Sequence, residues 1–168
     1  DGSTVCPANA NGVARIKPTV GLTSRAGVVP ISHIQDSVGP HGRTVADAAA
    51  VLSVIQSRTS DGRDPATGGV PLGWTGRARP ANIPTDYTQF LDPNGLRGAR
   101  LGLTRQGIDS APPQVVAAFD AAVAAIQAAG ATVVDLDGAG FTFAPADGEF
   151  RVLLYEFRRD LNRYLAGL

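Results

Sequence analysis

The chain has few of the side chains from which metal sites, disulfides and membrane spans are built. Its 168 residues include one cysteine, Cys6, and two histidines, His33 and His41. A lone cysteine cannot form a disulfide within the chain, and so small a set of His and Cys residues argues against a structural zinc site. No apolar run approaches the ~18 residues that a membrane-spanning helix needs. The sequence therefore predicts neither a metal centre nor a membrane partner.

Charge of one sign is not in excess either. The 15 Lys and Arg residues balance the 15 Asp and Glu residues, which argues against a nucleic-acid partner. Hydrophobic residues make up 43% of the chain and charged residues 18%, as in a folded domain with a core. The 20 Gly and 12 Pro residues predict many turns and long irregular stretches.

The chain has no methionine, and it begins at Asp1-Gly2-Ser3, inside a turn-like motif. We therefore expect an interior portion of a longer polypeptide, whose location, cytoplasmic or secreted bacterial, the sequence leaves open. We expect one partial domain over 1–168. It would consist of a motif-rich region over 1–57, a long irregular loop over 58–94 and a strand–helix–strand–helix segment over 95–168.

Sequence patterns typical of helices and strands appear in several parts of the chain. Thr44 and Asp47 resemble a capping box, and the helix that they open should run to about Gln56. Its expected buried face consists of Val45, Ala48, Ala49, Leu52 and Ile55. A strand over 100–104, a helix from 112–113 to about 130 and a strand over 131–136 have the length of a βαβ unit, which predicts parallel strands. A last helix should span 147–168, with an apolar side made of Phe150, Leu153, Leu154, Phe157, Leu161 and Tyr164.

Residues 1–43 show little periodicity but carry an ordered series of short motifs. In chain order these are Gly2-Ser3 with Pro7, Asn11-Gly12, Lys17-Pro18-Thr19 with Gly21, Ser24-Arg25 with Gly27, Asp36 with Gly39-Pro40, and Arg43-Thr44-Val45 with Asp47-Ala48. This order resembles the amidase signature family, serine hydrolases that cleave carboxamide C–N bonds. The resemblance implies an α/β fold with a mixed β-sheet core covered by helices, and no metal or organic cofactor.

The resemblance places Ser3 where the family has its nucleophile. It also implies an oxyanion hole made of backbone N–H groups of Asp1, Gly2 and Ser3. The residue types suit this chemistry, because attack on an amide carbonyl creates an oxyanion that aimed N–H donors stabilise by roughly 3–4 kcal/mol each. Gly before a nucleophile also permits close approach of the substrate to the backbone. By itself, Ser3 would be interpreted as a turn serine.

Two members of the family's Ser-Ser-Lys triad are absent from these residues. The Lys base and the second Ser, which has an unusual cis peptide, lie upstream of the nucleophile in the family. Lys17 is the only lysine, but it belongs to the Lys-Pro-Thr motif, so the resemblance gives it no base role. Because a serine hydroxyl needs a base to become nucleophilic, we expect the 168 residues alone to be inactive and to need the upstream part of their own chain.

Segments further along indicate the branch of the family. Pro30-Ile31-Ser32-His33, the stretch over 86–98 and the ending Glu156-Phe157 with Asp160-Leu161 resemble peptide amidases, which remove C-terminal amides. The implied substrate is a small amide or a peptide amide. Two alternatives remain: the A subunit of a tRNA-dependent amidotransferase, and a non-catalytic truncated module that binds amides or a partner chain.

Four other residues near these motifs have expected structural roles. His33 is expected to be a packed, hydrogen-bonded residue and not a base, and Cys6 a buried packing residue. Arg25 and Asp36 are expected to form a buried ion pair or to brace the backbone. A separate departure is Arg15, which replaces a glycine of the family pattern and would be costly if the position has positive φ or is tightly packed.

Overall fold

The computed structural model describes residues 2–68, 81–143 and 147–168. Its contacts form two compact units, one over 1–90 with 146–168 and the other over 91–145. A compact unit need not be a domain, and the single partial domain over 1–168 stays a prediction. The first unit contains α1 (Gly2–Asn11), β1 (Ala14–Arg15), β2 (His41–Gly42), α2 (Val45–Ile55), the 3-10 helices η1 (Pro65–Gly68) and η2 (Thr88–Phe90), and α4 (Asp147–Leu165). The second contains β3 (Arg100–Leu103), α3 (Pro113–Ala128) and β4 (Thr132–Asp135).

Helix α1 was not predicted, because its sequence has no amphipathic period and contains Pro7. Its C-terminus explains the Asn-Gly motif. Gly12 has φ +61°, and its N–H donates to the carbonyl of Asn9 at 3.2 Å, while the N–H of Val13 donates to Ala8 at 3.0 Å. These two bonds form a Schellman cap, which needs a left-handed residue that glycine provides without strain.

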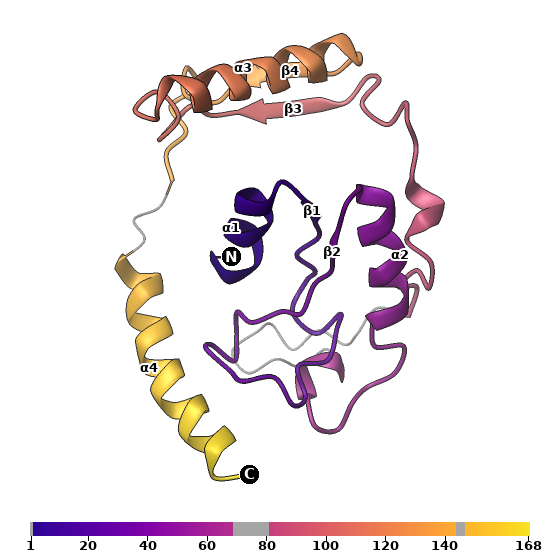
Figure 1. Cartoon of the computed structure of the whole chain (residues 1–168), viewed down its shortest axis with the longest axis vertical. Coiled ribbons are helices and arrows are strands. Elements are labelled where there is room, and N and C mark those ends of the chain that lie inside the picture. Colours follow the sequence, from indigo (N-terminus) through magenta and orange to yellow (C-terminus); the bar gives the residue numbers. More distant parts are fainter. Residues whose placement is uncertain (1, 69–80, 144–146) are drawn as a thin grey trace. The chain divides into compact units, whose positions relative to one another are not determined.

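The first sheet is a short antiparallel pair in which Ala14 lies opposite Gly42 and Arg15 opposite His41. Its strands lie beside α1 and α2 (Figure 1). Gly42 permits this arrangement, because a Cβ at that position would lie 2.7 Å from the backbone nitrogen of Ala48 in α2. The Gly-rich motifs thus place the backbone of β2 directly against the start of a helix.

Helix α2 confirms the predicted capping box. The Thr44 hydroxyl accepts from the N–H of Asp47 at 3.1 Å, and the Asp47 carboxylate accepts from the N–H of Thr44 at 2.9 Å. Ala48, Ala49 and Leu52 are buried as expected, whereas the ends of the predicted face are not, since Val45 is 61% exposed and Ile55 37% exposed.

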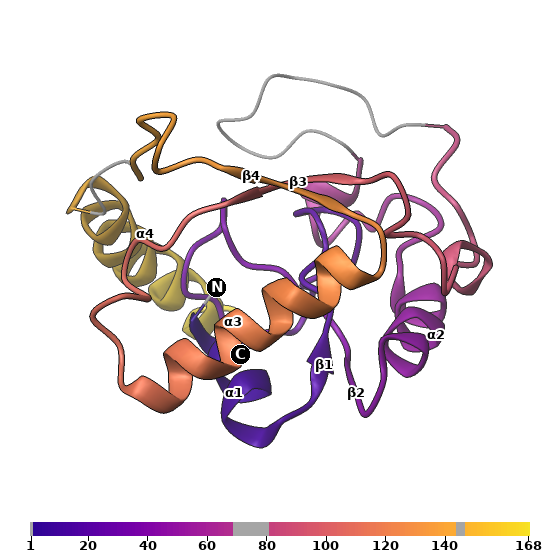
Figure 2. The ribbon, with the colours of Figure 1, turned by 90° about the horizontal axis from the view of Figure 1, so that it is seen from above.

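The second unit confirms the predicted parallel strands. Strands β3 and β4 pair in parallel from Arg100 opposite Thr132 to Leu103 opposite Asp135, with α3 between them in the chain and beside β4 (Figure 2). Gly130 ends the helix region with φ +94°. The fold is α/β, as predicted, and the described strands form two two-stranded sheets, one antiparallel and one parallel.

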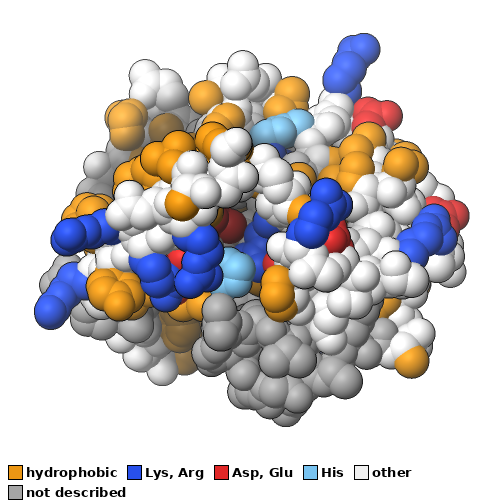
Figure 3. Space-filling model, turned by 90° about the horizontal axis from the view of Figure 1, so that it is seen from below, with side chains coloured by type: hydrophobic (Ala, Val, Ile, Leu, Met, Phe, Trp, Pro, Cys, Tyr) orange, Lys and Arg blue, Asp and Glu red, His pale blue; other side chains and the backbone are white. Residues whose placement is uncertain are grey.

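The described residues bury little apolar surface. Their buried hydrophobic residues are Leu52 and five alanines: Ala8, Ala48, Ala49, Ala66 and Ala131. Large hydrophobic side chains lie open to solvent instead, and Figure 3 shows several on one face. Within the described part of the chain, no helix is long and apolar enough to cross a membrane.

Helix α4 differs from the predicted amphipathic pattern. Phe150, Leu154 and Phe157, assigned to the buried side, are 62%, 55% and 41% exposed, whereas Glu156 and Asp160 are buried. The predicted packing face was therefore wrong in these positions, because burial on α4 follows hydrogen bonds from another segment and not hydrophobicity.

Two signature glycines are required by close backbone contacts. Gly21 has φ +89°, and a Cβ there would lie 2.1 Å from the carbonyl oxygen of Ala66. A Cβ at Gly39 would lie 2.2 Å from the carbonyl oxygen of Ile16. The irregular segments of the first unit therefore pack backbone against backbone.

We expect Gly21→Ala to lower the free energy of unfolding by about 2–4 kcal/mol, because it combines left-handed strain with overpacking. Urea unfolding of the protein that contains this chain measures the change. Gly62→Ala is the matched control, since Gly62 has open space around it and no positive φ. Equal stability of the two variants would contradict the role given to Gly21.

Candidate active site

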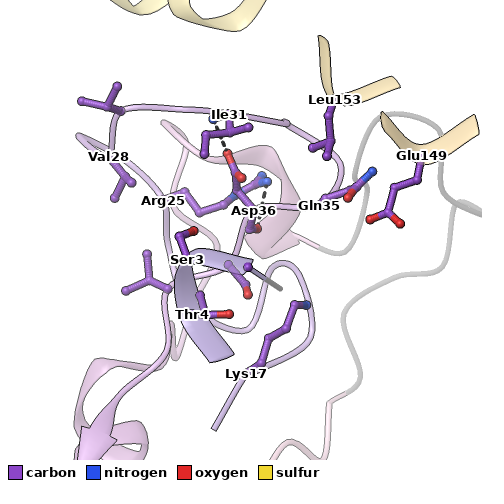
Figure 4. Close-up of a pocket in the computed structure, with 14 residues that line it drawn as sticks. Ser3, Thr4, Lys17, Arg25, Val28, Ile31, Gln35, Asp36, Glu149 and Leu153 are labelled. Carbon is purple, nitrogen blue, oxygen red and sulfur yellow. Dashed lines mark hydrogen bonds between the residues drawn. The ribbon is translucent and has the colours of Figure 1, made fainter. Parts of the chain in front are cut away.

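A pocket of about 400 Å³ lies in the first unit, between the start of α1, the irregular segment that follows β1, and α4 (Figure 4). Its lining combines hydroxyl, charged and aliphatic side chains. The residues are Gly2, Ser3, Thr4, Lys17, Arg25, Val28, Val29, Ile31, Gln35, Asp36, Ser37, Val38, Glu149 and Leu153. The sequence motifs and the final helix thus contribute to one concave site.

Ser3 lies on the first turn of α1 and lines this pocket. The first N–H groups of an α-helix have no acceptor within the helix, and the helix dipole makes this end attractive to negative charge. The N–H groups of Gly2 and Ser3 are in this position. Pro7 lacks the N–H that would bond the Ser3 carbonyl four residues earlier. Asp1, the third residue expected in the oxyanion hole, lies outside the described residues.

Arg25 forms the most extensive polar contact of the first unit, and its acidic partner is Asp64. The guanidinium donates to Asp64 Oδ2 at 2.9 Å and Oδ1 at 2.6 Å, and the Arg25 backbone N–H donates to Oδ2 at 2.8 Å. Both side chains are nearly inaccessible, at 8% and 3% exposure. The guanidinium also donates to the backbone carbonyls of His33 and Asp36. The expected ion pair between Arg25 and Asp36 was therefore wrong.

Asp36 instead braces the backbone, which was the other expectation. One of its carboxylate oxygens accepts from the N–H of Ile31 at 2.8 Å and of Ser32 at 3.0 Å. Figure 4 shows Asp36 and Ile31 joined in this way at the rim of the pocket. The segment over 31–36 is thus a tight turn whose N–H groups are bonded by a carboxylate.

Helix α4 binds two further N–H groups of this turn. Glu156 Oε2 accepts from the Ser32 hydroxyl at 2.6 Å and from the N–H of Ile34 at 3.3 Å, and Asp160 Oδ2 accepts from the N–H of His33 at 3.0 Å. Arg159 bridges the two carboxylates at 2.9 and 2.7 Å. We call Glu156, Arg159 and Asp160 the carboxylate clamp.

The clamp changes the acidity of its carboxyl groups. Burial would raise the pKa of Glu156, but hydrogen bonds from Ser32, Ile34 and Arg159 bring it below its usual value of 4.5. Burial would likewise raise the pKa of Asp160, but hydrogen bonds from Arg159 and His33 outweigh burial and lower this pKa. The pKa of Asp64 is lowered against burial by its bonds to Arg25. These carboxylates are therefore bound in their charged form.

Sequence reasoning missed Asp64 and Glu149 and gave Glu156 and Asp160 no structural role. Glu156 and Asp160 were noted only as marks of the peptide amidase branch, although their spacing of four places them on one helix face. Asp64 lies 39 residues from Arg25 in a stretch without regular spacing, so no local pattern links the two. Glu149 precedes the clamp on α4 and lines the pocket.

Three further expectations have clear outcomes. Cys6 is exposed, so its assignment as a buried packing residue was wrong. Arg15 lies in β1 without positive φ, so it carries no left-handed strain, and its guanidinium lies 2.7 Å from Nδ1 of His41. His33 is half-buried and held through its backbone, by Asp160 and Arg25. The described ranges contain no group of three or more His, Cys, Asp or Glu residues placed to hold a metal ion.

Comparison with known proteins identifies the family of the chain. The family model for amidases matches residues 1–167, and the chain belongs to the amidase family. It is 43% identical to a peptide amidase from Stenotrophomonas maltophilia of known structure, over 99% of this chain and 32% of that one, with a TM-score of 0.69. It is 38% identical to a probable amidase of Arabidopsis thaliana, over 100% of this chain and 30% of the relative.

The chain is also similar to part of an amidotransferase. It is 36% identical to the A subunit of the glutamyl-tRNA(Gln) amidotransferase of Thermosynechococcus vestitus, over 84% of this chain and 27% of the relative. The chain thus spans less than a third of the length of each of these three proteins. The predicted resemblance to the amidase signature family, with likeness to peptide amidases, is confirmed.

We expect Asp160→Ala to lower the free energy of unfolding by about 2 kcal/mol, because it leaves the half-buried N–H of His33 without an acceptor. Asp160→Asn keeps an acceptor oxygen and should lose less. Urea unfolding of both variants measures the difference. Equal losses in the two variants would mean that the acceptor at this position does not stabilise the fold.

The clamp also predicts acid sensitivity. Carboxyl groups with lowered pKa stabilise the folded state above their ordinary values, here 3.8 for Asp and 4.5 for Glu, and this stability is lost as the pH falls below them. The free energy of unfolding should therefore decrease as the pH is lowered from about 5 to 3. Glu156→Gln should flatten this decrease, whereas Glu149→Gln, which removes an exposed carboxylate, should leave its slope in place. A slope unchanged in Glu156→Gln would contradict the contribution of the clamp.

Proposed function

We propose that the full-length protein hydrolyses carboxamide C–N bonds with Ser3 as the nucleophile. The observation that carries the proposal is the position of Ser3 at the N-terminus of a ten-residue helix, within a pocket of about 400 Å³, in a chain of the amidase family. A hydroxyl beside N–H donors that face a pocket is the arrangement that acyl transfer requires.

The proposed reaction has two steps. Ser3 Oγ attacks the carbonyl carbon of the amide, and its proton passes through a base to the leaving nitrogen, so that ammonia or an amine departs and an acyl ester forms on Ser3. Water then attacks the ester, which releases the carboxylic acid and restores the hydroxyl. The N–H groups of Gly2 and Ser3, with that of Asp1, stabilise the oxyanion of each step.

The proton transfer needs groups that these residues do not supply. Lys17 lines the same pocket, but it belongs to the Lys-Pro-Thr motif and we give it no base role. In the proposed enzyme the Lys base and the second Ser come from the upstream part of the same chain, as the family resemblance implies.

We further propose a small amide or a peptide amide as substrate. The pocket is lined by Val28, Ile31 and Leu153 as well as polar groups, so it offers aliphatic surface beside the nucleophile. Similarity to a peptide amidase supports the same substrate class. No nucleic acid, membrane or cofactor is part of the proposal.

Ser3→Ala should abolish amide hydrolysis by the full-length protein, lowering kcat by at least about 10⁴-fold with folding intact. Ammonia release measures activity, and circular dichroism checks the fold. Ser37→Ala provides the comparison, because Ser37 lines the same pocket and its loss should cost less than about tenfold. Unchanged turnover in Ser3→Ala would refute Ser3 as the nucleophile.

The similarity to part of an amidotransferase favours a second candidate function. The A subunit of an amidotransferase would release ammonia from glutamine and depend on companion chains and tRNA. A simple amidase would hydrolyse a peptide amide as a single polypeptide. We expect the purified full-length protein to release ammonia from a peptide amide without companions. Hydrolysis of glutamine but not of peptide amides, and only in the presence of companion chains, would favour the second candidate. Binding of amides without hydrolysis would favour a non-catalytic module.

A further inference from the structure

We propose that Glu149 makes the site selective for amides with a positively charged side chain near the scissile bond. The inference rests on the proposed function and concerns the end of the pocket formed by α4. Glu149 and Leu153 of α4 line the same pocket as Ser3. In Figure 4, Ser3 and Thr4 lie together on α1, while Glu149 and Gln35 lie at the other side of the site.

The charge of Glu149 has no partner among the described residues. The buried carboxylates of the first unit are neutralised, Asp64 by Arg25 and the clamp acids by Arg159. No ion pair or hydrogen bond joins the Glu149 side chain to any residue that the structure describes. A carboxylate at a pocket rim that is not paired within the protein attracts a cation of the ligand.

The lining next to Glu149 suits the stem of such a ligand. Leu153 lies one turn after Glu149, and Ile31 and Val28 line the pocket with it. A lysine-like side chain has an aliphatic stem with a charged end, so it can bury its methylene groups on this surface and place its cation near Glu149. The pocket also contains a cation of its own, Lys17, whose side chain projects from the segment that follows β1 (Figure 4).

The carboxylate clamp fixes the orientation of Glu149. Residues 149, 153, 156 and 160 follow each other at spacings of four, three and four, so they lie on one face of α4. Because Glu156 and Asp160 are bonded to the turn over 32–34, this face is turned towards the pocket wall. Glu149 is thus presented by a helix that is anchored further along its own length.

The test compares two substrates with the same four-carbon side chain, N-acetyl-lysinamide, which carries a terminal ammonium group, and N-acetyl-norleucinamide, which does not. We expect the full-length protein to prefer the lysinamide in kcat/KM by about fivefold at low salt, the strength of one close charge pair in high dielectric. Glu149→Gln should remove the preference, Glu149→Asp should retain part of it, and about 0.5 M NaCl should weaken it in the parent protein. Arg151→Gln, a charge change nearby on α4 outside the pocket lining, should leave the ratio unchanged.

Binding to the Ser3→Ala variant separates the inference from the proposed chemistry. Calorimetry should give a Kd about fivefold lower for the lysinamide than for the norleucinamide, and this ratio should approach one when Glu149→Gln is added. A ratio that does not change with Glu149→Gln, or equal binding of the two amides, overturns the inference whatever the catalytic result. Hydrolysis that survives Ser3→Ala, with the charge preference present, would instead overturn the proposed nucleophile alone.

Discussion

The side chain of Arg25 holds together parts of the chain that have no regular secondary structure. It joins Asp64 to the backbone carbonyls of His33 and Asp36, and it is almost fully buried. Removing one partner of such a buried pair would leave an uncompensated charge, which is strongly destabilising. With a hydrophobic core made chiefly of alanine, the first unit depends on this polar network to fix the pocket wall.

The turn over 31–36 extends the same principle. Its N–H groups have no neighbouring strand, and buried N–H groups without acceptors are costly. Carboxylates of Asp36, Glu156 and Asp160 accept from four of them, so side chains supply the acceptors that a neighbouring strand would otherwise provide. The mechanism of the proposed enzyme needs such rigidity, because the pocket opposite Ser3 is lined by this turn.

Sequence patterns correctly predicted the elements that depend on residues close together in the chain. The capping box at Thr44 and the βαβ spacing over 100–136 each depend on residues close in sequence, and the structure confirms both. The partners of Arg25 and of the turn were beyond such reasoning. Ser32 and Glu156 are 124 residues apart, and two carboxylates four residues apart on a helix have no sequence signature that names such distant partners. The expectation that Ser3 is the nucleophile came from the resemblance of the ordered motifs to a family, and not from periodicity.

Helix α4 has its anchoring contacts and its pocket-lining residues at different positions. Glu156 and Asp160 carry the contacts that hold the helix, whereas Glu149 and Leu153, nearer its start, line the pocket and make none of those bonds. A substitution at Glu149 or Leu153 therefore alters the surface offered to a ligand without breaking the clamp. The turn and Arg25 are held by bonds to Asp36 and Asp64, so the wall formed by them does not depend on Glu149 or Leu153. Because the bonds that hold the helix come from Glu156, Arg159 and Asp160, the positions nearer its start can change without breaking them.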